Sequence, residues 1–200
     1  MRWKSVRVVL PLSILSVVLC TSVSLAGIDF DEGTTALYRL HTRDGTEYYV
    51  EYAVLQKDGD NIWIQAVTRH LPEGAPDIIF QVLIDNPEEL TPVKMLVKPP
   101  GQDAVWIKTD GMGGADATLT PLSEEKAQAL WDAGGTQKVV TDAGTFDCVY
   151  INRDETQTWI SNAVGPLAIV KVVSTNGTTM ELVSYGRQSV EDLIPKKPAQ

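Results

Sequence analysis

Cys148 is the residue best suited by type to covalent chemistry, and it lies in the run TFDCVYI. A catalytic thiol needs a base beside it, usually a histidine, and an electropositive setting that favours the thiolate. His41 and His70 are far from it in the sequence, and no pattern indicates that either approaches it. Because cysteine is among the most frequently buried residues, we predict that Cys148 packs in the core. A thiol-dependent enzyme is the less favoured alternative.

The sequence gives weaker support for a metal site or a phosphate-binding loop. Neither histidine has a second ligand at a spacing typical of zinc sites. The run 57–61 (KDGDN) lacks the spacing and the terminal glutamate of a calcium loop, and a hairpin turn explains it. The run 110–114 (DGMGG) lacks the Lys-Ser/Thr pair that completes a phosphate-binding loop. No GxSxG elbow occurs either, so we predict a non-enzymatic protein with no cofactor and no metal.

Aromatic residues are the remaining candidates for binding, because ligand pockets are lined mainly by apolar and aromatic side chains. An ordinary core is the alternative. It is favoured for a closed barrel, whereas an open curled sheet covered by one helix favours a cavity. The candidate cavity residues are Tyr48, Tyr52, Trp131, Phe146, Tyr150 and Trp159.

Short β-like runs separated by turn signals make up most of the chain. Residues 46–56 alternate, which places Tyr48, Val50, Tyr52 and Val54 on one side of a strand. Asp44-Gly45 and Asn176-Gly177 are typical of hairpin turns. We count about ten strands with short connections, and therefore predict a mainly β protein built as a single antiparallel curled sheet or half-barrel.

One helix is predicted between these strands. Thr120 can cap it, Pro121 suits its first position, and Gly134-Gly135 ends it. Its apolar face is narrow, which is typical of a helix lying on a sheet. We expect residues 121–133 to pack on the concave side of the sheet, with Trp131 near the strand around Phe146. Those face residues are Leu122, Ala127, Leu130 and Trp131.

The first 26 residues have the pattern of a signal peptide. A basic start precedes the apolar run from Val8 to Leu19, and Ser24-Leu25-Ala26 supplies the small residues of a cleavage site. The apolar run is shorter than the roughly 20 residues that a membrane-spanning helix needs. A buried helix is the less favoured alternative. Cys20 follows a sequence similar to a lipobox, but Leu19 stands where a small residue is usual, so lipid anchoring at Cys20 is the minority interpretation.

The rest of the chain is predicted to form one β-rich domain over residues 27–186 and a tail over 187–200. The tail offers a short helical turn from Ser189 to Ile194, ended by Pro195. Removal of residues 1–26 takes the formal net charge from −9 to −12, which argues against nucleic acid and anionic membranes as partners. Cys148 is then the one remaining cysteine, so no intramolecular disulfide can form.

Four runs near the C-terminus, GTFDC, TWIS, VGPLAIVK and MELVSY, resemble those of exported bacterial domains of unknown function. These domains are similar to the half-barrel lipoprotein carriers of the LolA/LolB-like fold. The resemblance implies an incomplete barrel around a helix, with an apolar concave face that binds acyl chains or a protein partner. The carriers have several covering helices where this sequence predicts one, so no binding residue is carried over by name.

Two functions follow from these patterns. The first is a periplasmic or secreted, non-enzymatic binding protein that holds a lipid or another apolar molecule. The alternative is a cell-envelope interaction or scaffold module that pairs with a protein through an exposed strand edge. The alternative predicts a filled core and a sheet edge free of charge or proline.

Overall fold

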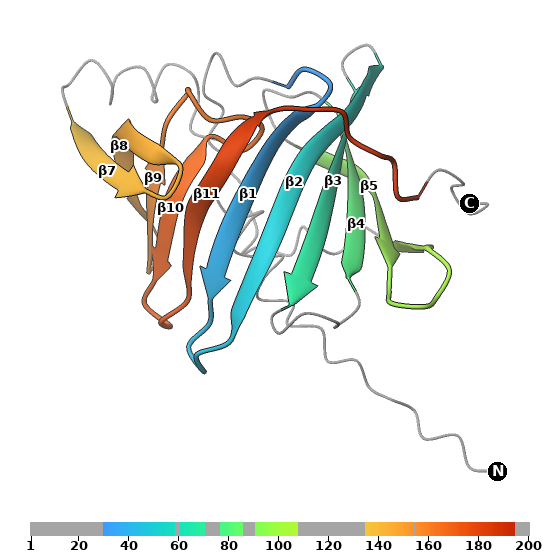
Figure 1. Cartoon of the computed structure of the whole chain (residues 1–200), viewed down its shortest axis with the longest axis horizontal. Coiled ribbons are helices and arrows are strands. Elements are labelled where there is room, and N and C mark those ends of the chain that lie inside the picture. Colours follow the sequence, from blue (N-terminus) through green and yellow to red (C-terminus); the bar gives the residue numbers. More distant parts are fainter. Residues whose placement is uncertain are drawn as a thin grey trace.

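The computed structural model describes residues 30–58, 61–70, 77–85, 91–107, 135–153 and 155–194. Within these ranges the chain forms one antiparallel sheet of eleven strands, slightly more than the number predicted (Figure 1). The sheet is open, with β6 and β7 at its edges, which confirms the prediction of a mainly β protein built on a single antiparallel sheet. The strands are β1 (Thr34–His41), β2 (Glu47–Asp58), β3 (Asn61–His70), β4 (Ile78–Asp85), β5 (Thr91–Lys98), β6 (Val105–Ile107), β7 (Thr136–Thr141), β8 (Gly144–Arg153), β9 (Thr156–Ile160), β10 (Ile169–Ser174) and β11 (Thr179–Arg187).

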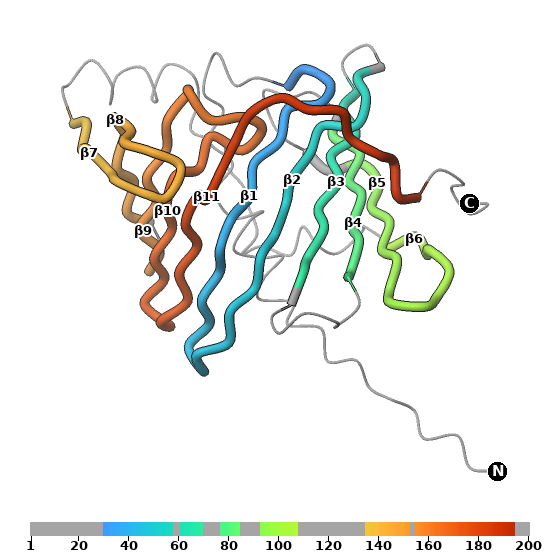
Figure 2. The backbone as a smooth tube through the Cα atoms, in the orientation of Figure 1, coloured from blue at the N-terminus to red at the C-terminus, as the bar shows by residue number. Residues whose placement is uncertain are grey.

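The sheet consists of two meanders that meet at one seam. Strands β1 to β6 lie side by side in sequence order, and β11 to β7 extend in the other direction from β1 (Figure 2). At the seam, Leu40 of β1 pairs with Met180 of β11. Two of the sequential hairpins turn at glycines with positive φ, Gly45 (84°) and Gly177 (89°). Glycine adopts this backbone conformation without the steric cost that a Cβ brings, so the turn signals at these positions are confirmed.

One face of the sheet, which we call the apolar face, carries the main hydrophobic core. On β2 the predicted alternation is confirmed, because Val50, Tyr52 and Val54 are buried while Glu47 and Glu51 lie on the other side. Cross-strand partners share a face, so the core continues from strand to strand. Buried residues of the apolar face include Tyr38, Leu40, Val50, Tyr52, Val54, Ile62, Ile64, Met95, Ile160, Val172, Met180 and Leu182.

The opposite face, which we call the polar face, carries charged side chains and a smaller apolar cluster. That cluster contains Val67, Ile79, Leu96 and Ile194. Ile194 belongs to residues 188–194, which leave β11 and cross the sheet toward β5 (Figure 2, red). We call residues 188–194 the crossing segment. The helical turn predicted for Ser189 to Ile194 is wrong, because this segment is non-helical and its backbone groups bond to side chains of the sheet.

The β7–β8 hairpin folds back over the sheet. Asp142, in its turn, lies 3.0 Å from Arg39 of β1, and the ring of Phe146 meets that of Tyr185 on β11 at a centroid distance of 5.6 Å. As a result β8 is buried on both sides at its middle, where the adjacent residues Cys148 and Val149 lie inside the core. Curvature at this end of the sheet therefore brings sequence-distant strands into contact (Figure 1).

Several predictions fall outside the described residues. They are the signal peptide over residues 1–26 with Cys20, and the helix over residues 121–133 with Trp131. The placement of that helix on the concave side therefore stays a prediction, as does the division into a domain at 27–186 and a tail.

Candidate functional site

The apolar face is continuous across the seam between the two meanders. One row runs from Val172 through Met180 to Leu40, all three fully or almost fully buried. The rings of Tyr38 and Tyr52 meet edge to face at 5.8 Å, and the Tyr38 hydroxyl donates a hydrogen bond to the carbonyl of Ile169 at 3.0 Å. This buried hydrogen bond pairs the hydroxyl group of Tyr38, so the face remains apolar in character.

Burial also keeps two tyrosine side chains of this face in their neutral form. It raises the pKa of Tyr38 above the ordinary value of 10.0, and it raises the pKa of Tyr52 well above that value, with the neighbouring Tyr38 adding to the second shift. Both side chains are therefore neutral phenols at physiological pH. A surface of neutral side chains suits an apolar ligand and offers no charge to an ionic one.

Parts of the apolar face are only half-buried, which distinguishes them from the closed core. Tyr48, Phe80, Val82 and Ile151 pack against the core cluster but keep some exposed surface. Of these, Tyr48 was among the predicted cavity residues. Phe80 and Val82 were not singled out as binding residues, although their alternation within the run IIFQVLID was a usable signal.

The other predicted cavity residues lie elsewhere in the fold. Tyr150 and Trp159 are cross-strand partners whose rings lie 5.2 Å apart, and Trp159 pairs in turn with Lys171, which places them on the polar face. Phe146 is buried in the main core cluster, and its ring contacts that of Tyr185. The structure thus brings Tyr48 and Tyr52 to one face and joins Tyr150 to Trp159 on the other. That the whole set lines a ligand cavity stays a prediction.

Cys148 lies in the core as predicted. Its side chain is fully buried, and its Sγ lies 3.8 Å from the carbonyl oxygen of Phe146, to which the thiol donates. Burial, with a smaller effect of the Asp147 charge, raises its pKa from the ordinary value of 9.0 to about 12. At neutral pH the group is a protonated thiol, which is neither the nucleophile nor the metal ligand that a thiolate would be.

Across the described ranges, no three or more histidine, cysteine, aspartate and glutamate side chains gather closely enough to hold a metal ion. In the same ranges, no helix has the length and apolar character that a membrane crossing requires.

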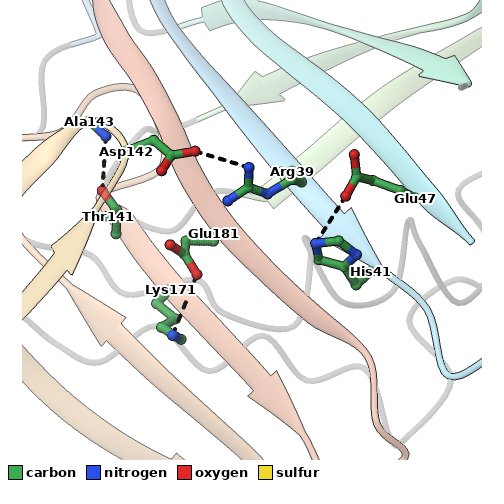
Figure 3. Close-up of polar contacts among 8 residues, drawn as sticks. All are labelled: Arg39, His41, Glu47, Thr141, Asp142, Ala143, Lys171 and Glu181. Atoms are coloured by element: carbon green, nitrogen blue, oxygen red, sulfur yellow. Dashed lines mark hydrogen bonds and ion pairs between the residues drawn. The ribbon is translucent and has the colours of Figure 1, made fainter. Parts of the chain in front are cut away.

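The polar face carries partly exposed ion pairs near the seam (Figure 3). Lys171 of β10 lies 3.4 Å from Glu181 of β11, and Arg39 reaches Asp142 in the β7–β8 turn. His41 lies 3.1 Å from Glu47 in the β1–β2 hairpin. Pairs this exposed typically contribute about 0–1 kcal/mol each, so they orient the hairpins more than they stabilise the sheet.

A second site, which was not predicted, lies where the crossing segment meets β3 and β4. Gln81 is completely buried and Gln65 almost so, and the Gln81 amide donates a hydrogen bond to Gln65 Oε1 at 3.0 Å. A groove of about 190 Å³ opens beside them between the segment and strands β2 and β3. Its lining residues are Glu51, Ala53, Gln65, Val67, Arg69, Gln188, Ser189, Val190, Glu191 and Leu193. One signal was present, since a glutamine inside the apolar run IIFQVLID implies a buried polar contact.

No known protein family matches the chain, and no curated protein matches it in sequence. Among solved structures, the chain is similar to the crystal structure of a "putative lipoprotein" from Parabacteroides distasonis ATCC 8503. The two share 12% sequence identity, and the alignment covers 80% of this chain and 98% of the other with a TM-score of 0.38. A likeness this distant carries no conclusion about the activity or ligand of this chain, and the relation to the LolA/LolB-like carriers stays a resemblance in sequence pattern.

Proposed function

We propose that this protein is an exported, non-enzymatic binding protein that holds a lipid or another apolar molecule on the apolar face of its open sheet. The observation that carries the proposal is the continuous apolar face, which spans both meanders and includes neutral, buried tyrosines. Its half-buried members, such as Tyr48 and Phe80, are the surfaces that an apolar ligand would contact first. The signal-like first 26 residues support export.

Two adjacent tyrosines on β2 allow a matched test. Tyr48 lies on the apolar face and Tyr49 on the polar face, and both are half-buried. Burying an aromatic side chain against a ligand contributes on the order of 1–3 kcal/mol. We therefore expect Tyr48→Ser to weaken binding of a fluorescent fatty acid by about tenfold or more. Tyr49→Ser should leave the affinity unchanged while removing a side chain of the same size.

Fluorescence titration of the purified full chain measures both affinities, and thermal melts establish that each variant is folded. Equal losses in the two variants would indicate binding that does not depend on the apolar face. No binding of the fatty acid by the wild type would refute the proposal. Repeated recovery of the exported protein without any co-purified lipid would also refute the proposal.

The second candidate function, a strand-edge interaction with an envelope protein, is favoured by one observation. Edge strand β6 has neither charge nor proline, and Val105 is 50% exposed. The other edge strand, β7, carries Lys138, which pairs with Asp147 at 2.9 Å and protects that edge from further pairing. A photo-crosslinking amino acid at position 105 should then capture one partner protein in cells, and the same group at Val140 on β7 should not. Equal capture at both edges, or none at position 105, would contradict this candidate.

A further inference from the structure

The crossing segment is held largely through its backbone. Gln65 Nε2 donates a hydrogen bond to the carbonyl of Glu191 at 3.1 Å, and the amide of Leu193 donates one to Gln65 Oε1 at 3.0 Å. Lys98 Nζ donates to the carbonyl of Leu193 at 3.2 Å. The side-chain amide of Gln65 thus pairs with alternate peptide groups as a neighbouring strand would. Contacts of this kind bind any extended peptide and depend little on its sequence.

Side-chain selectivity comes from the far end of the segment. Gln81 Nε2 donates to Asp192 Oδ1 at 2.6 Å, and the Ile194 side chain is buried in the smaller cluster with Val67 and Leu96. Because Gln81 is completely buried, its side-chain N–H groups need hydrogen-bond acceptors, and one acceptor must come from that position of the peptide. The site therefore selects a hydrogen-bond acceptor two positions before an aliphatic residue, and Asp192 supplies that acceptor in this chain.

The middle of the segment leaves part of the site unfilled. The groove of about 190 Å³ is lined in part by Ser189 and Val190, whose side chains are small, and Ser189 is exposed. Gln188 is held at the start of the segment, where its amide donates to the carbonyl of Gly33 at 2.9 Å and its side chain donates to Glu51 Oε1 at 3.2 Å. With residues 191–194 held as described above, the space lies at Ser189 and Val190. A peptide with larger apolar side chains at those two places would fill the groove while keeping every backbone contact.

We propose that the polar face around Gln65, Gln81 and Lys98 is a peptide-binding site, which the crossing segment occupies in the free protein. Its ligand is an extended segment of a partner protein with a hydrogen-bond acceptor residue followed by two aliphatic residues, as in Asp192-Leu193-Ile194, and with bulkier side chains over the groove. The crossing segment is then a competitor in cis that lowers the apparent affinity for the partner by the fraction of time it is bound. The site lies on the opposite face from the apolar ligand and does not depend on it.

Trans binding of a synthetic peptide tests the proposal. The probe is a fluorescein-labelled peptide with the sequence of residues 188–194, and a second peptide carries S189W and V190L. We expect the full chain with Ile194→Asp, whose segment cannot seat in the apolar cluster, to bind the probe at least about tenfold more tightly than the wild type. The second peptide should bind more tightly than the first, because it fills the groove.

Two further variants distinguish recognition of the peptide backbone from general destabilisation of the protein. Glu191→Ala keeps the backbone carbonyl that Gln65 contacts and changes only an exposed side chain, so it should bind the probe as weakly as the wild type. Adding Gln65→Leu to Ile194→Asp should abolish binding, since both peptide contacts of the Gln65 amide are lost. Fluorescence anisotropy measures each affinity, and circular dichroism establishes folding.

Hydrogen exchange on the wild type gives a second test that needs no variant. The amides of Leu193 and Ile194 should exchange much faster than those of β3, because the segment opens without unfolding the sheet. Exchange of these amides only with global unfolding would overturn the proposal, and so would an Ile194→Asp protein that binds the probe no better than the wild type. A wild-type dimer whose two copies exchange this segment would assign the site to the chain itself and overturn the assignment to a partner.

Discussion

The two faces of the sheet are built by the same strands and are stabilised by different interactions. On β1, Leu40 is fully buried in a core that crosses the seam, whereas its neighbour Arg39 lies on the polar face in a partly exposed pair with Asp142. Packing of this kind is cooperative and depends on shape, while ion pairs in solvent are weak and separable. The comparison indicates that the apolar face determines whether the sheet forms, and that the polar face determines which segments lie on it.

Substitution of the two neighbours on β1 should give the largest difference. Leu40→Ala removes a fully buried side chain and should lower the free energy of unfolding by about 2–5 kcal/mol. Arg39→Ala should lower it by less than about 1 kcal/mol. Urea denaturation measures both values. Similar losses would show that the ion pairs on the polar face stabilise the sheet as much as its core does.

Burial of ionisable side chains also predicts a loss of stability in alkali. Burial raises the pKa of Cys148 from 9.0 to about 12, so above about pH 9 the unfolded chain releases a proton that the folded chain keeps. This contribution is fully present below pH 9 and is lost as the pH rises toward 12. Tyr38 acts in the same direction above its ordinary value of 10.0.

Urea denaturation at about pH 8 and about pH 10.5 should therefore show lower stability at the higher pH. Cys148→Ala should reduce the difference, because it removes the thiol contribution. A difference of the same size in the variant would show that Cys148 is not the group responsible.

Two glycines test how closely the crossing segment approaches the sheet. Gly33 and Gly45 have nearly equal φ values, 83° and 84°, so alanine strains the backbone equally at both. Only at Gly33 would the new Cβ meet another atom, 2.5 Å from the carbonyl oxygen of Gln188. We expect Gly45→Ala to cost about 1–2 kcal/mol and Gly33→Ala to cost more and to displace the segment. Peptide binding in trans should increase only in Gly33→Ala, and equal behaviour of the two variants would argue against close docking.

The smallest effect is expected at the exposed pair on the β7–β8 hairpin. Lys138 and Asp147 are both largely exposed, and their contact is 2.9 Å. Lys138→Ala should change the free energy of unfolding by less than about 0.5 kcal/mol. Its effect should appear instead as association at this edge, which analytical ultracentrifugation measures. A large loss of stability would mean that the hairpin depends on this pair.

The sequence predicted the local part of this fold well. The alternating run over residues 46–56 matches β2 to within two residues at each end, and the Asp44-Gly45 turn lies where expected. These features depend on side-chain alternation and on turn chemistry within a few residues, which a single sequence displays.

The non-local features could not be predicted in this way. The pairing of β1 with β11 and the contact of Asp142 with Arg39 join residues more than a hundred positions apart. The helical turn expected at 189–194 fails for the same reason, because Gln65 satisfies backbone groups that a helix would have satisfied internally. For the candidate site, alternation identified Tyr48 and Tyr52 as sharing a face, but it could not show that β9 presents Trp159 on the other.

Native mass spectrometry of the exported protein tests the central claim most directly. Binding on the apolar face predicts that the wild type, purified gently from the periplasm or medium, carries an added mass that organic extraction identifies as a lipid or another apolar molecule. Tyr48→Ser should lose that mass and Tyr49→Ser should keep it. A wild-type protein that repeatedly shows only the mass of its polypeptide, or an adduct lost equally from both variants, would contradict the claim.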